Sequence, residues 1–301
     1  MAEVEIILGT KDGARHLGPQ LASFAGQSLQ DWTLLVSDDG STDGTCAMVA
    51  RFGTARPATR LRLALGPGAG VAANYLSLLR QADPNARAIA LSDQDDVWFP
   101  DKLARALAAL RHVPRGCPAL YAARSVLIDA QGLPLRRARQ KAFHPSFANA
   151  LVQNVAPGNT IVLNRAAADL AARAQPPGAP PFHDWWLYAL ISGASGAVIL
   201  DAAPVLAYRQ HGESVLGAHA GLAASARRAA LLAGGQWRKW LDQHHAALAS
   251  VAPHLTPGAR AQLAAIRAAR PRPRALAAAR AYRQGPVGAV VMALACRVGL
   301  A

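Results

Sequence analysis

Short apolar runs alternate with helical segments over the first 112 residues, and this alternation limits the folds that the chain can adopt. The apolar runs cover residues 4–8, 33–36, 61–65 and 88–91, and a helical segment is predicted after each of them. Strands and helices that alternate in this way form a mostly parallel sheet with helices on both faces. The sequence therefore predicts a Rossmann-like α/β fold whose ligands bind at the carboxyl ends of the strands.

The remainder of the chain has a less regular pattern. Helices are predicted at residues 99–112 and 165–174 and from Asp184 onward, strands at 119–128, 160–163, 198–200 and 205–208, and an arginine-rich loop at 133–141. Helical patterns follow at 221–250 and 257–270, and residues 285–300 are apolar except for Arg297.

The composition is that of a globular protein, with 52% hydrophobic and 17% charged residues, and excludes disorder of the whole chain. The net charge of +14 is unevenly distributed. Residues 221–301 hold 12 Lys and Arg against the single acid Asp242, whereas residues 1–220 hold 20 against 17 acids. The basic C-terminal part predicts contact with an anionic surface, either a membrane leaflet or nucleic acid.

Cysteine usage and hydropathy predict a cytoplasmic protein. The three cysteines, Cys46, Cys117 and Cys296, are odd in number and far apart, which argues against a disulfide framework and a cysteine-based zinc site. The first residues lack the positive start and apolar core of a signal peptide. The uncharged runs 185–200 and 284–296 are shorter than the roughly 20 residues that span a bilayer.

Three carboxylates stand within four residues after the fourth apolar run: Asp93, Asp95 and Asp96. Alternate residues of an extended chain point the same way, so Asp93 and Asp95 are expected to project together. Mg²⁺ and Mn²⁺ take such oxygen ligands and commonly share them with substrate phosphates, which predicts a metal-assisted site for a phosphate ester. The alternative is a solvated acidic turn that stabilises the start of the helix after Pro100.

Two further acidic loops are expected on the same rim of the sheet. Asp12 follows the first predicted strand, and Asp38 and Asp39 follow the second. Because parallel strands end at one edge, these carboxylates should lie beside the acidic cluster. For Asp38 and Asp39 the alternative is a turn that caps the next helix, since Gly40 and Ser41 fit that role equally well.

Five motifs occur in the order seen in family 2 glycosyltransferases of the GT-A fold, and they most resemble the bacterial rhamnosyltransferase-like branch. The motifs are residues 10–13 (Thr-Lys-Asp-Gly), 37–43 (Ser-Asp-Asp-Gly-Ser-Thr-Asp), 92–98 (Ser-Asp-Gln-Asp-Asp-Val-Trp), 183–186 (His-Asp-Trp-Trp) and 208–212 (Tyr-Arg-Gln-His-Gly). The resemblance extends over residues 3–215, and each motif alone is a weak signal.

The resemblance implies a nucleotide-sugar donor and a divalent metal, Mg²⁺ or Mn²⁺. It places the following residues against the nucleotide sugar: Thr10, Asp12, Asp38, Asp39, Asp93, Gly158 and Asn159. It makes Asp95 and His211 metal ligands, which would neutralise charge on the leaving diphosphate; without the resemblance, a lone histidine is more often structural. Lys11 and Asp12 depart from relatives, which often carry Tyr and Asn, so a base-stacking role for position 11 is not expected.

Asp184 is the expected catalytic base. An inverting transfer needs a base on the face opposite the leaving group, which takes the proton of the acceptor hydroxyl. The resemblance places this base in the His183-Asp184 pair, and the alternative is an ordinary helix N-cap. Trp185 and Trp186 are the expected acceptor-binding residues because they offer a stacking face for a sugar, although either also suits a core position.

These observations divide the chain into a GT-A domain at residues 1–220, with a nucleotide-binding half at 1–115 and an acceptor half at 116–220, and a basic helical extension at 221–301. The extension has the composition of an interfacial membrane anchor. The expected function is transfer of a deoxysugar, rhamnose from dTDP-rhamnose, to a lipid-linked or polysaccharide acceptor at the cytoplasmic face of the membrane.

The sequence also allows two other functions. A non-enzymatic protein acting through its basic tail is the first, because Trp237-Arg238-Lys239-Trp240 interleaves aromatic and basic residues as base-stacking proteins do. The tail lacks a recognised nucleic-acid motif, which argues against nucleic acid as a partner. The second is a nucleotidyltransferase, which also uses metal-bound carboxylates but releases pyrophosphate.

Overall fold

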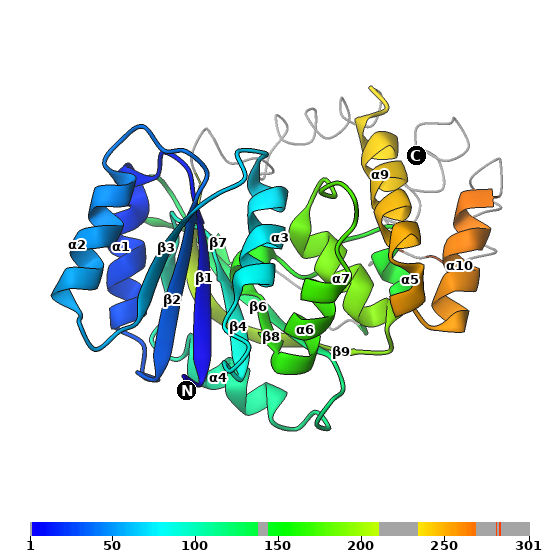
Figure 1. The fold of residues 1–301 in the computed structure, drawn as a ribbon, viewed down its shortest axis with the longest axis horizontal. Coiled ribbons are helices and arrows are strands. Elements are labelled where there is room, and N and C mark those ends of the chain that lie inside the picture. The colour runs from blue at the N-terminus through cyan, green and yellow to red at the C-terminus, as the bar shows by residue number, and fades with distance from the viewer. Residues whose placement is uncertain (1, 138–143, 211–233, 269–280, 282, 284–301) are drawn as a thin grey trace.

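The computed structural model describes residues 2–137, 144–210, 234–268, 281 and 283 (Figure 1). Within this part of the chain, nine strands form one sheet in the order β3-β2-β1-β4-β8-β6-β9-β5, and β7 pairs with β6. The strands are β1 (Val4–Thr10), β2 (Trp32–Asp38), β3 (Leu61–Leu65), β4 (Ala88–Ser92), β5 (Val97–Trp98), β6 (Ala119–Ile128), β7 (Pro134–Arg137), β8 (Val162–Asn164) and β9 (Ala197–Arg209). The helices are α1 (Ala14–Ala25), α2 (Thr45–Ala55), α3 (Val71–Gln81), α4 (Lys102–Leu110), α5 (Phe147–Ala150), α6 (Arg165–Arg173), α7 (His183–Gly193), α9 (Gln236–Ser250) and α10 (Pro257–Ala268), with 3-10 turns η1 (Gly158–Thr160) and η2 (Ala252–His254).

The N-terminal half is the parallel sheet that the alternating pattern predicts. β1 lies between β2 and β4, and β3 extends the sheet beyond β2, all in parallel. The register pairs Thr10 with Asp38 and Leu8 with Ser92, so the three strands end at one edge. This edge brings the three acidic loops of the sequence together, and the predicted α/β fold is confirmed.

Successive residues of each strand point to opposite faces of the sheet, and both faces are covered by a buried core. Ile7 and Leu35 belong to one buried cluster, and their neighbours Ile6 and Leu34 belong to the other. This is the period of two that a strand buried on both faces shows. Helices α1 and α2 lie on one side of the sheet and α3, α6 and α7 on the other (Figure 1).

Two predictions for the second half of the chain are corrected. Residues 133–141, expected to be a loop, contain β7, because the hydrogen bonds of Asp129 close a tight turn that pairs β7 with β6. The two expected strands at 198–200 and 205–208 are the single strand β9. The sequence predicts a break at residues 201–204, but β9 continues to pair with β6 there through register shifts. Within this irregular stretch, Asp201 accepts a hydrogen bond from the nitrogen of Ala203 at 2.8 Å.

Helices α9 and α10 share the hydrophobic core on one face of the sheet. Leu248 of α9 and Leu263 of α10 are buried in the same hydrophobic cluster as Leu190 of α7. These two helices confirm the predicted patterns over residues 236–250 and 257–268. Residues 221–233 and the predicted apolar anchor at 285–300 lie outside the described residues. Among the helices that the structure describes, none is long and apolar enough to cross a membrane.

Candidate active site

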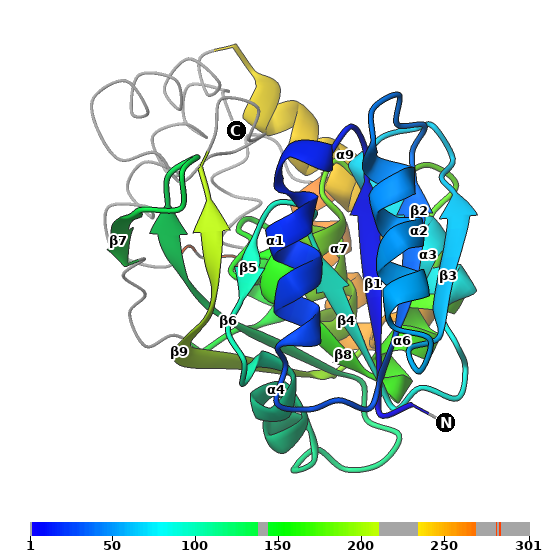
Figure 2. The ribbon, with the colours of Figure 1, turned by 90° about the vertical axis from the view of Figure 1, so that its left-hand side faces the viewer.

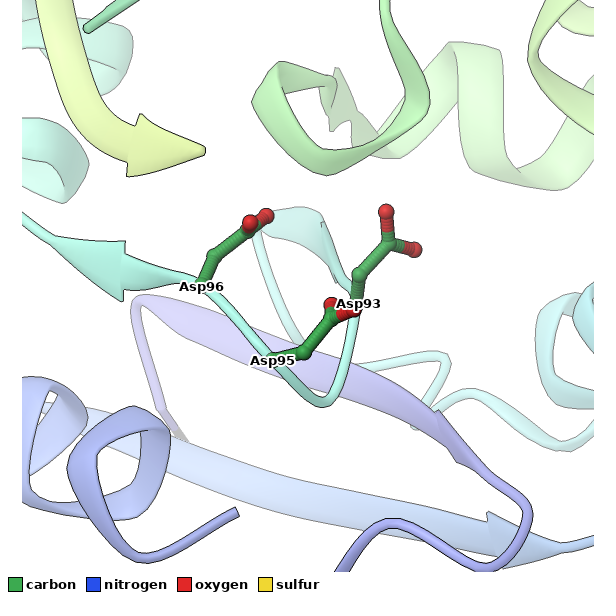
Figure 3. Close-up of side chains that lie close together, drawn as sticks. All are labelled: Asp93, Asp95 and Asp96. Atoms are coloured by element: carbon green, nitrogen blue, oxygen red, sulfur yellow. The ribbon is translucent and has the colours of Figure 1, made fainter. Parts of the chain in front are cut away.

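The acidic loop, residues 93–96, joins β4 to β5 at the carboxyl edge of the sheet. Oxygen atoms of Asp93, Asp95 and Asp96 all lie within 4.8 Å of one another (Figure 3). Asp93 and Asp95 lie together, but through a turn and not along the extended chain that the sequence predicted. Asp96 joins them, because the chain bends at residues 94 and 95 and is not extended there. Asp96 is fully buried, whereas the other two carboxylates are partly accessible.

The packed carboxylates strongly disfavour one another's charge. Burial, and after it the charge of Asp95, raises the pKa of Asp93 to about 7. Burial and the charges of both neighbours raise the pKa of Asp96 well above its usual value. A divalent cation fits this site, because three carboxylate oxygens, the hard donors that such a cation prefers, converge there.

A buried lysine lies beneath the acidic loop. The ammonium of Lys102 donates to the backbone oxygen of Asn159 at 2.5 Å and lies 3.3 Å from the ring centre of Trp98. Asn159 in turn donates from its side chain to Asp96 at 2.6 Å. Burial lowers the pKa of Lys102, and the charges of Asp96 and Asp93 oppose that shift. The sequence places Asn159 against the donor, but here its side chain is hydrogen-bonded to Asp96 beneath the acidic loop.

Asp96 also fixes the end of β9. It accepts a hydrogen bond from the backbone nitrogen of Arg209 at 3.2 Å. The guanidinium of Arg209 is buried and donates to the backbone oxygen of Asp95 at 3.0 Å. The chain leaves this point toward His211, the expected metal ligand, which lies outside the described residues. Asp96 therefore supports the acidic loop, the role that the sequence favoured for it over metal binding.

Asp38 organises its own loop. Its carboxylate is buried and accepts hydrogen bonds from the Thr10 hydroxyl at 2.7 Å and from both the nitrogen and the hydroxyl of Ser41, at 2.7 and 2.6 Å. Burial alone would raise the pKa of Asp38, but these hydrogen bonds outweigh burial and lower it. Thr10 and Asp38, which the sequence places against the nucleotide, are thus hydrogen-bonded to each other.

Asp39 and Asp12 link neighbouring loops of the same rim. Asp39 accepts hydrogen bonds from the backbone nitrogens of Gly68 at 2.6 Å and Gly70 at 3.1 Å, in the loop between β3 and α3. Asp12 accepts from the nitrogen of Thr42 at 2.7 Å, and this bond lowers its pKa. Both residues are exposed enough to meet a ligand as well as to hold the loops.

Gln94 joins the first loop to the acidic loop. Its side-chain oxygen accepts from the nitrogen of Lys11 at 2.9 Å, and its side-chain nitrogen donates to the oxygen of Lys11 at 3.0 Å. A side chain at Gly13 would place its Cβ 2.2 Å from the oxygen of Gln94. A side chain at position 13 would therefore displace the amide of Gln94 from its two hydrogen bonds with Lys11.

Tyr75 of α3 contacts the acidic loop and the start of α7. Its hydroxyl donates to the backbone oxygen of Ser92 and lies 3.0 Å from Asp93 Oδ1. Its ring stacks on His183, with ring centres 3.9 Å apart and planes at 13°. Burial raises the pKa of Tyr75 and lowers that of His183, so the phenol remains protonated and the imidazole neutral near pH 7.

Asp184 faces the acidic loop from the first turn of α7. It accepts hydrogen bonds from the side chain of Asn154 at 2.8 Å and from the nitrogens of Gly158 at 3.2 Å and Trp185 at 2.7 Å. A carboxylate has about four acceptor positions, so one remains for a substrate hydroxyl. The residue after Gly158, Asn159, donates to Asp96, so the turn at residues 158–159 contacts both Asp184 and the acidic loop. The sequence places Gly158 against the nucleotide sugar. In the structure its backbone nitrogen donates a hydrogen bond that orients Asp184.

Trp185 and Trp186 do not offer the expected stacking face for an acceptor sugar. Their exposed fractions are only 3% and 0%. Trp185 donates from its indole to the oxygen of Ala150 at 2.7 Å and packs against His244 of α9, with ring centres 4.4 Å apart. The apolar sequence of α7 explains this burial, because the helix is covered on both sides. Both rings are core residues that hold the first turn of α7.

Two site residues were missed in the sequence, Tyr75 and Lys102, and Arg209 was noted only as part of the motif at residues 208–212. Lys102 carried a signal, since it stands four residues before Ala106 and eight before Leu110, on the apolar face of its helix. A charge at such a position indicates a buried partner. Tyr75 resembled any core aromatic residue, and nothing in the local sequence distinguished it.

The curled, mostly parallel sheet with an acidic loop at its carboxyl edge has the GT-A fold. Solved structures share this fold. S. aureus TarS (residues 1–349) in complex with UDP-GlcNAc is 13% identical, with 93% of this chain and 90% of that chain covered and a TM-score of 0.56. The mannosyltransferase PcManGT from Pyrobaculum calidifontis, in complex with GDP-Man and Mn²⁺, is 19% identical, with 97% and 87% covered and a TM-score of 0.52.

Sequence comparison agrees with this class. Residues 6–143 match the family described as "Glycosyl transferase family 2". The dTDP-rhamnosyl transferase RfbG of Shigella flexneri is 25% identical over 259 residues, covering 80% of this chain and 84% of that protein. The putative glycosyltransferase EpsE of Bacillus subtilis is 31% identical over 109 residues, covering 36% and 38%. Residues 6–143 thus resemble a family 2 glycosyltransferase domain, and the chain is a glycosyltransferase, as the motifs predict.

Proposed function

We propose that the protein is an inverting, metal-dependent glycosyltransferase that moves rhamnose from dTDP-rhamnose to a lipid-linked or polysaccharide acceptor at the cytoplasmic face of the membrane. One observation carries this proposal: Asp184 accepts a hydrogen bond from the nitrogen of Gly158 at 3.2 Å, and the next residue, Asn159, donates to Asp96 of the acidic loop at 2.6 Å. A leaving-group site and a base therefore face one space, as an inverting displacement requires.

The acidic loop would hold the divalent cation, Mg²⁺ or Mn²⁺. Asp95 is the proposed ligand, with His211 completing the set from the segment after β9. When bound, the cation supplies charge stabilisation for the departing nucleoside diphosphate. Asp93 is proposed to contact the ribose and the donor sugar, and Thr10, Asp12, Asp38 and Asp39 form the nucleotide rim. Asp96 holds the loop through Asn159 and Arg209.

Asp184 is proposed as the base. It accepts the proton of the acceptor hydroxyl while that oxygen bonds to the anomeric carbon and the bond to the diphosphate oxygen breaks. The hydrogen bonds from Asn154 and Gly158 fix the carboxylate, which lowers the cost of orienting it in the transition state. Inversion follows because the nucleophile attacks opposite the diphosphate.

The donor assignment rests on similarity to RfbG, named a dTDP-rhamnosyl transferase. Membrane association is supported by the basic composition of residues 221–301. Among the other functions that the sequence allows, a non-enzymatic role does not fit a glycosyltransferase domain. A nucleotidyltransferase differs in its product, because it releases pyrophosphate in place of a nucleoside diphosphate.

A donor panel tests the proposal. The purified protein is incubated with dTDP-rhamnose, UDP-glucose, UDP-GlcNAc and GDP-mannose, with lipid-linked and polysaccharide acceptors, with and without EDTA. The expected result is dTDP release and glycosyl transfer from dTDP-rhamnose alone, abolished by EDTA and restored by Mg²⁺ or Mn²⁺. Turnover that resists EDTA contradicts the metal requirement, and preference for another donor contradicts the rhamnose assignment.

A further inference from the structure

The hairpin between β6 and β7 exposes two leucines that no described element covers. Leu133 is 64% exposed and Leu135 is 56% exposed. They stand two residues apart in an extended segment, so they share one face of the hairpin. The turn is well formed, because Asp129 accepts hydrogen bonds from the nitrogens of Gln131 at 2.9 Å and Leu133 at 2.8 Å. The leucines are thus presented outward by an ordered hairpin.

The hairpin is attached directly to the active site. The guanidinium of Arg209 donates to the backbone oxygens of Ala130 at 3.0 Å and Asp129 at 3.3 Å. The same side chain donates to the oxygen of Asp95 in the acidic loop. One buried arginine therefore links the turn of the hairpin to the proposed metal ligand. Whatever binds the hairpin is held near the donor site.

The charge of the hairpin favours an anionic lipid surface over other partners. β7 carries two consecutive arginines, Arg136 and Arg137, immediately after the exposed leucines. Apolar side chains that enter a bilayer interface, next to cations that meet acidic headgroups, are the combination that binds such surfaces. Nucleic acid would use the arginines but not the leucines. The area that two leucine side chains can bury is also far smaller than the roughly 800 Å² that each partner buries in a stable protein–protein interface.

We propose that the β6–β7 hairpin docks on an anionic lipid surface, with Leu133 and Leu135 entering the interface. This contact would hold the active-site rim against the membrane, where a lipid-linked acceptor lies. The benefit to catalysis rests on the proposed function, but the lipid contact itself does not depend on it. The contact is separate from the C-terminal membrane anchor that the sequence predicts.

Vesicle cosedimentation of the full-length protein tests the contact without donor or acceptor. Vesicles of phosphatidylcholine with phosphatidylglycerol are compared with vesicles of phosphatidylcholine alone. Leu133→Ser/Leu135→Ser should lower the partition coefficient about tenfold or more. Arg136→Gln/Arg137→Gln should lower it about fivefold per arginine on the anionic vesicles only. A second membrane-binding segment elsewhere in the chain would not hide these losses. The binding free energies of two independent segments add, so each segment multiplies the partition coefficient by its own factor.

The matched control is Leu63→Ser/Leu65→Ser. These leucines are 43% and 89% exposed on β3, at the opposite side of the sheet (Figure 2). The control should partition like the wild type, and thermal melting should show that all variants are folded. Wild-type partitioning of the hairpin variant overturns the proposal, as does an equal loss in the control. The cosedimentation experiment does not measure glycosyl transfer. Failure of the proposed transferase activity would therefore leave its outcome unchanged.

Discussion

The ring of Tyr75 stacks on the imidazole of His183 at 3.9 Å between ring centres, and its hydroxyl lies 3.0 Å from Asp93. One residue of α3 therefore touches both the acidic loop and the helix that begins with the proposed base. The position of the acidic loop relative to the first turn of α7 depends on this side chain, which is buried in the core. The two contacts can be removed separately.

Tyr75→Phe removes the hydroxyl and keeps the stacking, whereas Tyr75→Leu removes both. Loss of the hydroxyl leaves buried acceptors without a donor, a cost of about 1–3 kcal/mol. We expect Tyr75→Phe to raise the donor KM about tenfold with kcat nearly unchanged, and Tyr75→Leu to lower kcat as well. Steady-state kinetics with dTDP-rhamnose measure both. Identical kinetics of the two variants would show that the stacking does not position α7.

Cation binding should depend on pH through Asp93. With a pKa of about 7, Asp93 stays protonated in the folded protein at pH values where the unfolded chain has released this proton. Without metal, stability therefore falls as pH rises from about 4 to about 7. A divalent cation binds the deprotonated carboxylates, so the increase in Tm with Mn²⁺ should be larger at about pH 8 than at about pH 6.

The control for this prediction is a pair of carboxylate variants. Asp95→Asn should lose the increase in Tm with Mn²⁺ at both pH values. Asp101→Asn, which alters an exposed carboxylate at the start of α4, should keep it. An increase that is independent of pH, or that survives in Asp95→Asn, would show that the cation binds elsewhere.

The C-terminal helices should be needed for folding. Leu248 is 1% exposed and packs in the same cluster as α7. Leu248→Ala should lower the free energy of unfolding by about 2–5 kcal/mol, because it leaves a cavity. Lys239→Ala, on the exposed face of α9, should change it by about 0.5 kcal/mol or less.

Truncation after residue 220 removes both helices and should give an insoluble or unfolded protein. Circular dichroism and thermal melting measure both effects. A folded and active truncated protein would mean that residues 221–301 form an independent extension, as the sequence suggested.

Much of the fold could be predicted because local pattern and tertiary structure agree there. The bounds of β3 and β6 match the predicted residues, since each begins and ends at a turn signal. β9 was predicted as two strands because Pro204 and its neighbours resemble a break, and only pairing with β6 carries the strand through them. Pairing of this kind is a long-range contact that local patterns do not encode.

The candidate site could be predicted only as far as its residue types reveal chemistry. Asp93 and Asp95 were found because carboxylates at a strand end indicate a metal. The roles of Asp96 and Asn159 depend on contacts across more than 60 residues of sequence, so only the fold reveals them. Trp185 was misjudged because the partner that covers it, His244, lies on α9.

The most direct test of the account is Asp184→Asn. Asn keeps the size of the side chain and can still accept hydrogen bonds, but it cannot take a proton near neutral pH. Calorimetric titration should give a Kd for dTDP-rhamnose within about threefold of the wild type, while transfer falls by about 10²–10⁴. Asp169→Asn, at an exposed ion pair of α6, should retain full transfer. Transfer at the wild-type rate by Asp184→Asn would contradict its assignment as the base.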